Sequence, residues 1–215
     1  MEDAFSAALA RAGSAVGGAV VEELRKRGFD ALYAATKEQA LAAVLDLIPA
    51  GASVGVPGSV TVREIGAMEA LRARGCRMIQ HWGDMSSQAR AQARLDENAA
   101  DFFLTSANAL TQAGEIISID GMGNRVAAMA WGQGELIFVI GLNKLASTLE
   151  DGIRRARSAV IPNALRLGEE TPCTKAGRCV DCRTPSRACR AMLILEAPPR
   201  GRAVHVIIAG EGLGY

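Results

Sequence analysis

Four cysteines gather in one short polar stretch of the sequence. Cys173, Cys179, Cys182 and Cys189 lie within 17 residues, with the spacing C-x5-C-x2-C-x6-C. A C-x2-C pair brings two thiolates together locally, and the intervening Gly and Pro residues allow the flanking cysteines to fold back toward it. Four converging thiolates close a tetrahedral zinc site or ligate an iron–sulfur cluster. The spacing therefore predicts a metal-binding loop over residues 171–190.

Basic residues surround these cysteines. They favour the thiolate form and offset the charge of an anionic metal centre, which suits zinc and an iron–sulfur cluster equally. The residues are Lys175, Arg178, Arg183, Arg187 and Arg190. Two alternatives stay open: the thiols could be redox-active or disulfide-forming, or some could simply pack in the interior. Cys76 precedes an expected strand and is predicted to lie in the core.

A glycine-rich loop, Gly55-Val56-Pro57-Gly58-Ser59-Val60-Thr61, separates an expected strand from an expected helix over Val62–Arg74. This order aims backbone N–H groups at an anion. Gly58 allows close approach of the backbone, and the hydroxyls of Ser59 and Thr61 add donors. The loop is neither a P-loop nor a G-x-G-x-x-G fingerprint. A tight turn followed by a helix N-cap is the plainer interpretation.

Three short apolar runs, Asp101–Thr105, Glu115–Ile119 and Leu136–Ile140, have the composition of strands. Small polar and charged residues follow each run, at the strand ends where an α/β sheet usually builds its ligand site. They indicate recognition of a small anionic or carbonyl-bearing ligand, although Gly-Asn pairs are also ordinary turn formers. The candidates are Asn108, Asn124, Arg125, Asn143 and Lys144.

The remaining pattern alternates strands with helices, which predicts an α/β fold with a largely parallel sheet flanked by helices. We expect helices over 3–27 (with a break near Gly13, Gly17 and Gly18), 36–48, 86–98 and 144–164 (with a bend near 160–163). Further strands are expected at 29–35, 54–56, 77–80, 192–195 and 205–209. His81 follows one of these strands and is an acid/base or ligand candidate, but a structural role is the commoner one; His205 is interpreted as structural.

The composition is that of a well-cored soluble domain. The 215 residues are 49% hydrophobic and 22% charged, with a net charge of +1 that argues against a nucleic-acid partner. No apolar run reaches the roughly 18 residues of a membrane helix. The N-terminal segment, residues 1–28, opens with Glu2 and Asp3 and favours a cytoplasmic amphipathic helix over a signal peptide. We expect one domain over 1–215.

These motifs resemble the LUD (lactate utilization) domain family of bacteria. The likeness rests on Gly-x-x-Gly-Ser-Val-Thr at 55–61, Ser106 to Ile116, Asp120-Gly121-x-Gly-Asn-Arg-Val, Gly141-x-Asn-Lys and the cysteine loop. It implies a fold like the NagB/RpiA/CoA-transferase group and an association with oxidation of lactate to pyruvate beside iron–sulfur partner subunits. The chain departs from the family in lacking an added ferredoxin-like region and in having Trp131-Gly132-Gln133 where Gly-Pro is expected after an aromatic residue.

Three functions follow as alternatives. In the first, the protein is a component of a 2-hydroxy-acid oxidation system; the cysteine loop holds an iron–sulfur cluster, and the strand-end loops hold a small carboxylate, with charge from Arg125 and Lys144. In the second, suggested by the fold group alone, it is a CoA-transferase or isomerase with Glu115 or Asp120 as nucleophile or base. In the third, it is a non-enzymatic binding or assembly protein with a structural zinc.

Overall fold

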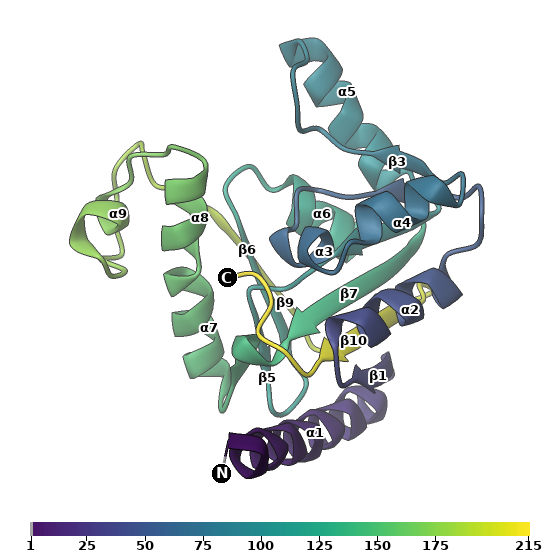
Figure 1. Ribbon diagram of the computed structural model, residues 1–215. Helices are drawn as coiled ribbons and strands as arrows, with labels where there is room; N and C mark the ends of the chain where they lie inside the picture. The colour runs from purple at the N-terminus through teal and green to yellow at the C-terminus, as the bar shows by residue number, and fades with distance from the viewer. Residues whose placement is uncertain (1) are drawn as a thin grey trace.

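The protein, seen here in a computed structural model that describes residues 2–215, is built around a six-stranded parallel sheet (Figure 1). The strand order is β1-β10-β7-β4-β2-β3, and all five pairings are parallel. The α/β fold predicted from the alternation of strands and helices is therefore confirmed. The strands are β1 (Asp30–Ala34), β2 (Ser53–Gly55), β3 (Arg77–Ile79), β4 (Phe102–Thr105), β7 (Glu135–Gly141) and β10 (Val204–Ala209).

A second sheet of four strands packs against the first. Its order is β8-β5-β6-β9, with bounds β5 (Ala109–Thr111), β6 (Ile116–Asp120), β8 (Leu145–Ala146) and β9 (Ala191–Leu195). β6 runs antiparallel to both β5 and β9, whereas β8 is parallel to β5. The sequence pattern predicted strands at 115–119 and 192–195 but did not reveal that they leave the parallel sheet for a separate, mostly antiparallel one.

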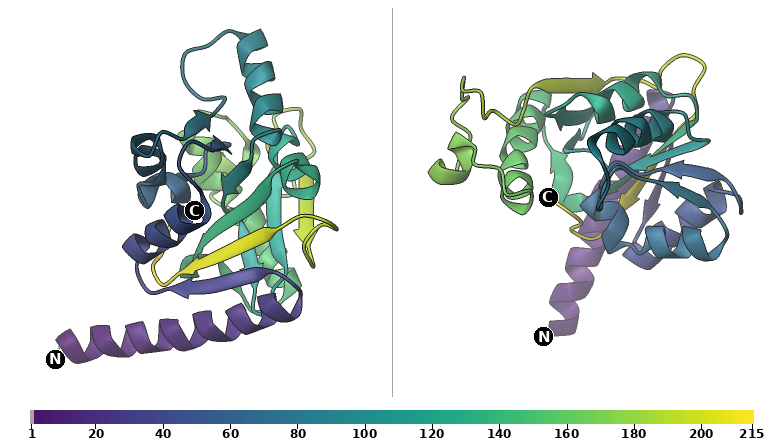
Figure 2. Two further views of the ribbon diagram at one scale, coloured as in Figure 1. Left: turned by 90° about the vertical axis from the view of Figure 1, so that its right-hand side faces the viewer. Right: turned by 90° about the horizontal axis from the view of Figure 1, so that it is seen from above.

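The two sheets and their helices form layers (Figures 1 and 2). Helices α2 (Lys37–Leu47), α3 (Val60–Glu64) and α4 (Ala67–Ala73) cover one face of the parallel sheet. Helices α1 (Glu2–Lys26) and α6 (Asn124–Trp131), together with the second sheet, cover the other. Central strand β7 serves both sides, since Ile137 faces the first cluster and Phe138 the second. Helices α7 (Leu149–Ser158) and α8 (Val160–Arg166) lie between β8 and β9 in the chain. Their residues Ala156 and Val160 pack against strand β6 of the second sheet.

Helix α1 is continuous, so the predicted break near its glycines is wrong. A side chain at Gly17 would overlap the Tyr33 ring, so this glycine permits close packing on β1 and does not end the helix. The C-terminal part of α1 is buried through residues such as Leu24, whereas Phe5 and Leu9 are exposed where the helix extends beyond the body (Figure 2).

By length and composition alone, residues 4–26 of α1 could cross a membrane, with a mean hydropathy of 1.4 over the relevant window. The expectation that no segment reaches that length is therefore wrong for this helix. The core helix of a soluble protein and a leader sequence meet the same criterion. The buried C-terminal part of α1 accounts for some of this apolar character.

Other helices differ from the predicted ones mainly at their ends. The glycine loop leads into α3 at Val60, two residues earlier than expected, and Gly66 in the left-handed region separates α3 from α4. The helical segment predicted over 144–164 begins later than expected, because a 3-10 turn (Leu142–Lys144) and β8 come first. The bend predicted near 160–163 is confirmed, since α7 ends at Ser158 and α8 begins at Val160. Pro162 falls in the first turn of α8, where its missing N–H leaves no helical hydrogen bond unmade.

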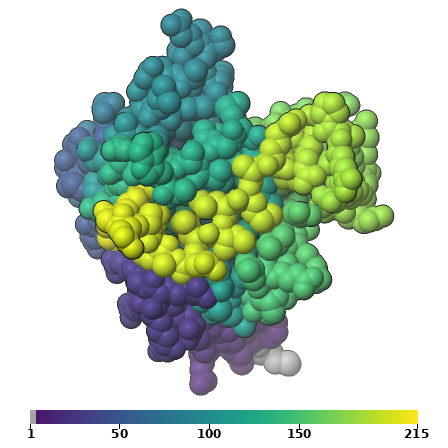
Figure 3. All heavy atoms as spheres, turned by 180° about the vertical axis from the view of Figure 1, so that it is seen from behind, coloured from purple at the N-terminus to yellow at the C-terminus, as the bar shows by residue number. Residues whose placement is uncertain are grey.

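The two remaining helices precede β4 and β9 respectively. α5 (Ser87–Asn98) begins after Ser86, whose hydroxyl accepts a hydrogen bond from the N–H of Ala89, as an N-cap does. This confirms the helix predicted there. α9 (Pro172–Ala176) opens the cysteine loop. Together with the neighbouring part of α8 this loop forms a lobe that stands out from the body (Figure 3).

Candidate functional site

A cleft of about 640 Å3 opens at the carboxyl ends of β2, β3 and β6 and is lined by residues that follow strands of both sheets. The glycine loop contributes Pro57 and Gly58 to one wall, and residues 185–190 of the cysteine loop contribute to another. The two motifs singled out in the sequence therefore face a common space. Five arginines line it, namely Arg94, Arg125, Arg166, Arg187 and Arg190, beside the acidic residues Asp120, Glu169 and Glu170.

A smaller pocket of about 70 Å3 adjoins this cleft and shares Gly58, Arg125 and Asn163 with it. It lies at the carboxyl ends of four parallel strands, because its walls come from the loops after β2, β4, β7 and β10. We call it the Lys144 pocket, after the buried lysine in its wall. Six of the predicted ligand-binding residues line it: Gly58, Ser59, Thr61, Asn108, Arg125 and Lys144.

Lys144 is almost completely buried, with 3% of its surface exposed. The 3-10 turn after β7 directs its side chain under the neighbouring strand ends, where Nζ donates to Thr61 Oγ1 at 2.8 Å and to Ser106 Oγ at 2.8 Å. Burial and, to a smaller extent, the positive charge of Arg155 lower the pKa of the amine to about 7, against the opposing effect of Glu64. Among the described residues, no carboxylate lies within ion-pairing distance of this amine.

The glycine loop holds its shape through Gly58 and Ser59. Gly58 has φ of +86°, and a side chain there would overlap the indole of Trp82. The Ser59 hydroxyl accepts a hydrogen bond from the N–H of Val62 at 3.3 Å and caps α3. The plainer interpretation of the loop, a turn followed by an N-cap, is therefore correct for Ser59. Thr61, which is buried, bonds Lys144 as well.

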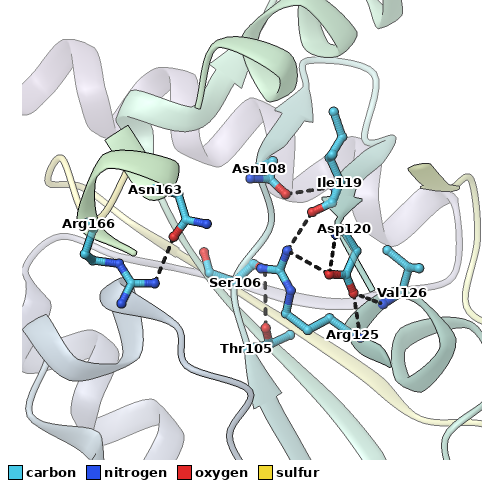
Figure 4. Close-up of polar contacts among 10 residues, drawn as sticks. Thr105, Ser106, Asn108, Ile119, Asp120, Arg125, Val126, Asn163 and Arg166 are labelled. Carbon is cyan, nitrogen blue, oxygen red and sulfur yellow. Dashed lines mark hydrogen bonds and ion pairs between the residues drawn. The ribbon is translucent and has the colours of Figure 1, made fainter. Parts of the chain in front are cut away.

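Asp120 is a capping residue that also holds Arg125 (Figure 4). Its carboxylate accepts hydrogen bonds from the N–H groups of Gly121 (2.8 Å), Arg125 (2.8 Å) and Val126 (3.4 Å) at the start of α6. The Arg125 guanidinium lies 3.5 Å from the same carboxylate and donates to Ile119 O at 2.6 Å. Arg125 is thus oriented on the wall shared by the cleft and the pocket, with part of its surface free for a ligand.

The predicted asparagines occupy different positions. Asn108 lines the Lys144 pocket, and its Oδ1 accepts from the N–H of Ile119 at 2.8 Å (Figure 4), so its NH2 group is not used in that bond. Asn124, the first residue of α6, lines the larger cleft. Asn143 lines neither space: its side chain binds the backbone of Leu213 at 3.0 Å and of Gly214 at 3.3 Å. It thereby holds the segment 210–215, whose Tyr215 closes the pocket.

Glu115 lies apart from the other candidates, at the opposite end of β6 from Asp120. It pairs with Arg27 of α1 and accepts a hydrogen bond from Thr111. Burial would raise the pKa of this carboxyl, but the bonds from Thr111 and the backbone and the charge of Arg27 together hold it below its ordinary value. The structure therefore gives Glu115 an ion-pairing role between α1 and the second sheet.

The two histidines have structural partners. His81 and Glu97 are buried, and the Glu97 carboxylate receives the His81 N–H at 2.8 Å and Nδ1 at 2.7 Å. This pair anchors the segment that carries Trp82 into the cleft wall. His205 bridges Asp30 and Glu135 at 2.7 and 2.8 Å, which ties β10 to both of its neighbours.

The cysteine loop is organised by Arg187. Its guanidinium donates to Cys189 O at 2.6 Å, to Cys182 O at 2.7 Å and to Asp181 Oδ1 at 3.1 Å. Cys173 is buried, whereas Cys179, Cys182 and Cys189 are partly exposed, and all four are free thiols. In residues 2–215, no three Cys, His, Asp or Glu side chains converge on one point. The donor types suit a metal, but their positions do not, so the loop would have to close to bind one.

Several residues of the site were not predicted. Ser106 stands in a strand-end motif that drew attention to Asn108, and its position directly after β4 was the available signal. Trp82 and Arg166 stack, with the guanidinium 5.6 Å from the ring centroid, across a separation of 84 residues. No local pattern marks such a pair, because only the folded chain brings α8 beside the loop after β3.

The fold and the cleft define an α/β protein with an open cleft and a small pocket at the carboxyl ends of its strands, the edge where such folds usually bind ligands. A solved structure of a DUF162 family protein from Deinococcus radiodurans shares this fold, with a TM-score of 0.52 and 14% identity over 92% of this chain and 98% of that one. The chain belongs to the LUD domain family, whose sequence model matches residues 18–209. This family is linked to lactate utilization. No curated protein matches the sequence.

Proposed function

We propose that the protein binds a small 2-hydroxy or 2-oxo carboxylate in the Lys144 pocket and serves as a cytoplasmic component of a lactate-oxidising system. The observation that carries the proposal is the buried Lys144 amine, which has hydroxyl partners but no carboxylate partner among the described residues. A buried cation without a counter-ion is costly, and an anionic ligand removes that cost. Arg125 adds a second cation to the same pocket.

The size of the pocket supports a small ligand. One water molecule needs roughly 10–15 Å3 of such space, and the pocket measures about 70 Å3. It therefore accepts about five to seven non-hydrogen atoms, the size of lactate or pyruvate. The hydroxyls of Ser106 and Thr61 and the amide of Asn108 are the polar groups available to the ligand's 2-oxygen.

Binding of lactate and pyruvate to the full chain, measured by calorimetry, tests this function. Replacing Lys144 with Met removes a charge-assisted hydrogen bond worth about 1.5–3 kcal/mol, so we expect affinity to fall roughly 10- to 100-fold. Arg154→Ala, on the exposed face of α7, is the matched control and should bind like the wild type. Equal affinities for wild type and Lys144→Met would refute the proposal.

Electron transfer needs a further component, because the sequence contains no nicotinamide or flavin fingerprint. We propose that iron–sulfur partner subunits and a cluster on Cys173, Cys179, Cys182 and Cys189 supply it, with zinc in that loop as the alternative. The placement of residues 185–190 on the cleft wall supports a role for this loop beside the ligand. The four thiols would have to converge before they could hold either metal.

Metal and sulfide analysis after anaerobic purification decides between the two metals. Iron with acid-labile sulfide in the wild type, lost in Cys179→Ser and Cys182→Ser, is the expected result. Cys76→Ala is the matched control, because Cys76 is buried in the core away from the loop and should leave the iron content unchanged. Zinc alone would instead favour the binding or assembly role.

The transferase alternative gains little from the carboxylates proposed for it. Glu115 lies outside both the cleft and the pocket, and Asp120 uses its oxygens to cap α6. A nucleophilic carboxylate needs a free oxygen beside the substrate. Loss of lactate binding on addition of an acyl-CoA would be the observation in favour of that role.

A further inference from the structure

The Lys144 amine has the surroundings of a nucleophile as well as those of an anion-binding group. Thr61 Oγ1 donates to Leu213 O at 3.4 Å, so it is left to accept from Nζ. Ser106 Oγ accepts from Nζ at 2.8 Å. These two hydroxyls use two N–H groups of the amine. In the neutral amine the remaining tetrahedral position of Nζ holds the lone pair. The neutral amine is the nucleophilic form of a lysine.

We propose that Lys144 forms a reversible imine with the carbonyl carbon of a 2-oxo acid bound in the Lys144 pocket. This inference rests on the proposed function, since it assumes that the pocket accepts such acids. It goes further in naming the bond, the residue and the class of substrate. A 2-hydroxy acid has no carbonyl carbon and can bind only without a covalent bond, so the pocket would hold the oxidised acid differently from the reduced one.

The charges around the amine favour this chemistry. Burial and the Arg155 guanidinium bring the pKa of Lys144 to about 7, against the opposing effect of Glu64. A substantial fraction of the amine is therefore neutral at physiological pH, which is how desolvated lysines become nucleophiles. Glu64 acts on the amine only through its charge and does not form an ion pair with it; its Oε2 accepts the N–H of Gly214 at 2.6 Å.

The pocket also supplies an anchor for the acid group. Arg125 is held in place by Asp120 and by the carbonyl of Ile119, and it lines the same pocket as Lys144. In a 2-oxo acid the carbonyl carbon is bonded directly to the carboxylate carbon. Binding the carboxylate to Arg125 therefore restricts the carbonyl to the interior of a pocket that has space for only a few atoms.

The reaction balances without any further reagent. The Nζ lone pair attacks the carbonyl carbon, a C–N bond forms, and the carbonyl oxygen receives the proton that the amine releases, with the Ser106 hydroxyl beside Nζ as the relay. The C–O bond then breaks, and the hydroxyl leaves as water with the second proton of the amine, which leaves the C=N bond. Addition of water reverses the sequence and returns the free lysine and the 2-oxo acid, with no change of oxidation state.

Reductive trapping tests the inference on the full wild-type chain. Incubation with pyruvate and cyanoborohydride should add, at Lys144, the mass of pyruvic acid less one oxygen atom, as peptide mapping by mass spectrometry would show. The chain provides its own controls, because its other three lysines, Lys26, Lys37 and Lys175, are all exposed. Lactate in place of pyruvate should give no adduct, and Lys144→Arg should abolish the adduct.

The outcomes separate this inference from the function on which it rests. An adduct confined to Lys144 supports the imine. Calorimetric binding of pyruvate with no adduct, or with adducts spread over the exposed lysines, overturns the imine and leaves the binding function standing. Absence of binding by either acid overturns both. Because the mapping uses the wild-type chain, its result does not depend on whether the Lys144→Arg variant folds.

Discussion

Burying the Lys144 amine makes the stability of the protein depend on pH in a way that one substitution should remove. The pKa of this lysine falls from 10.5 to about 7 on folding. Below about pH 7 the amine is protonated in both the folded and the unfolded state, so folding carries the full cost of burying the charge. Above 10.5 it is neutral in both, and the cost vanishes. Stability due to this group therefore rises with pH between these limits.

The size of the effect follows from the shift. At pH 7 the buried amine costs about 4 kcal/mol of unfolding free energy, and at pH 9 the cost falls to about 2 kcal/mol. In Lys144→Met, which has no titrating amine, this term is absent. We therefore expect the unfolding free energy of the wild type to gain about 2 kcal/mol relative to Lys144→Met between pH 7 and pH 9. The hydrogen bonds lost in Lys144→Met add a constant difference between the unfolding free energies of the two proteins. They do not change how that difference varies with pH.

Urea unfolding at a series of pH values, followed by circular dichroism, measures this difference. All other titratable groups are common to both proteins, so their effects cancel in the comparison. Lys175→Met is the control, since Lys175 is exposed and its removal should leave the pH profile parallel to that of the wild type. Parallel profiles for the wild type and Lys144→Met would refute the conclusion that burial suppresses the charge of this lysine.

Two further predictions concern the framework of the site. Glu97→Ala breaks a buried pair with His81 and should lower the unfolding free energy by about 3–5 kcal/mol, whereas Asp96→Ala, on the exposed side of the same helix, should change it by less than about 0.5 kcal/mol; similar urea midpoints for the two variants would contradict this. Gly17→Ala places a methyl group against the Tyr33 ring and should destabilise the protein by about 1–3 kcal/mol. A methyl group at Gly18 has open space, so Gly18→Ala should stabilise the protein by about 0.5–1 kcal/mol and raise its melting temperature. Equal melting temperatures for Gly17→Ala and Gly18→Ala would show that α1 does not pack closely on β1.

Local patterns predicted most of the individual elements. Strands such as β7 combine a Val/Ile/Phe run with polar residues at the end, and caps such as Thr36 and Ser86 mark helix starts by their side chains alone. These signals reside in a few consecutive residues, so they can be recognised without knowledge of the tertiary contacts. They also sufficed to recognise six of the residues that line the Lys144 pocket, because five of them lie in the segments after strands of the parallel sheet and the sixth, Arg125, follows the end of β6.

What the sequence could not reveal depends on partners distant along the chain. The low helix propensity of the glycines in α1 predicts a break, but Gly17 packs against Tyr33 of another element and the helix continues. Leu145 has a helical spacing with Leu149, yet it lies in strand β8, where it pairs with Leu110 of β5. The helix begins only after the N-cap residue Thr148. In each case a tertiary contact outweighed a local preference of a few tenths of a kcal/mol to about 1 kcal/mol.

The roles of the site residues also depend on both residue type, which is visible in the sequence, and position in the sheet, which is not. Glu115 has the chemistry of a catalytic carboxylate, but it stands at the amino end of its strand, where the fold directs it to Arg27. Asp120 stands at the carboxyl end of the same strand and reaches the cleft, although its oxygens serve α6. Residue type alone does not distinguish the two. The direction of the strand does, and it becomes known only with the sheet.

The position of Trp82 gives the cleft an optical signal of its own. The chain contains two tryptophans; Trp82 lies in the cleft wall beneath the Arg166 guanidinium, and Trp131 is 77% exposed at the end of α6. Trp131→Phe would leave a single indole, and its emission would then report only on the cleft. Ligand entry that moves Arg166 or excludes water from the ring would change the wavelength and intensity of that emission, so occupancy could be followed in real time without a label.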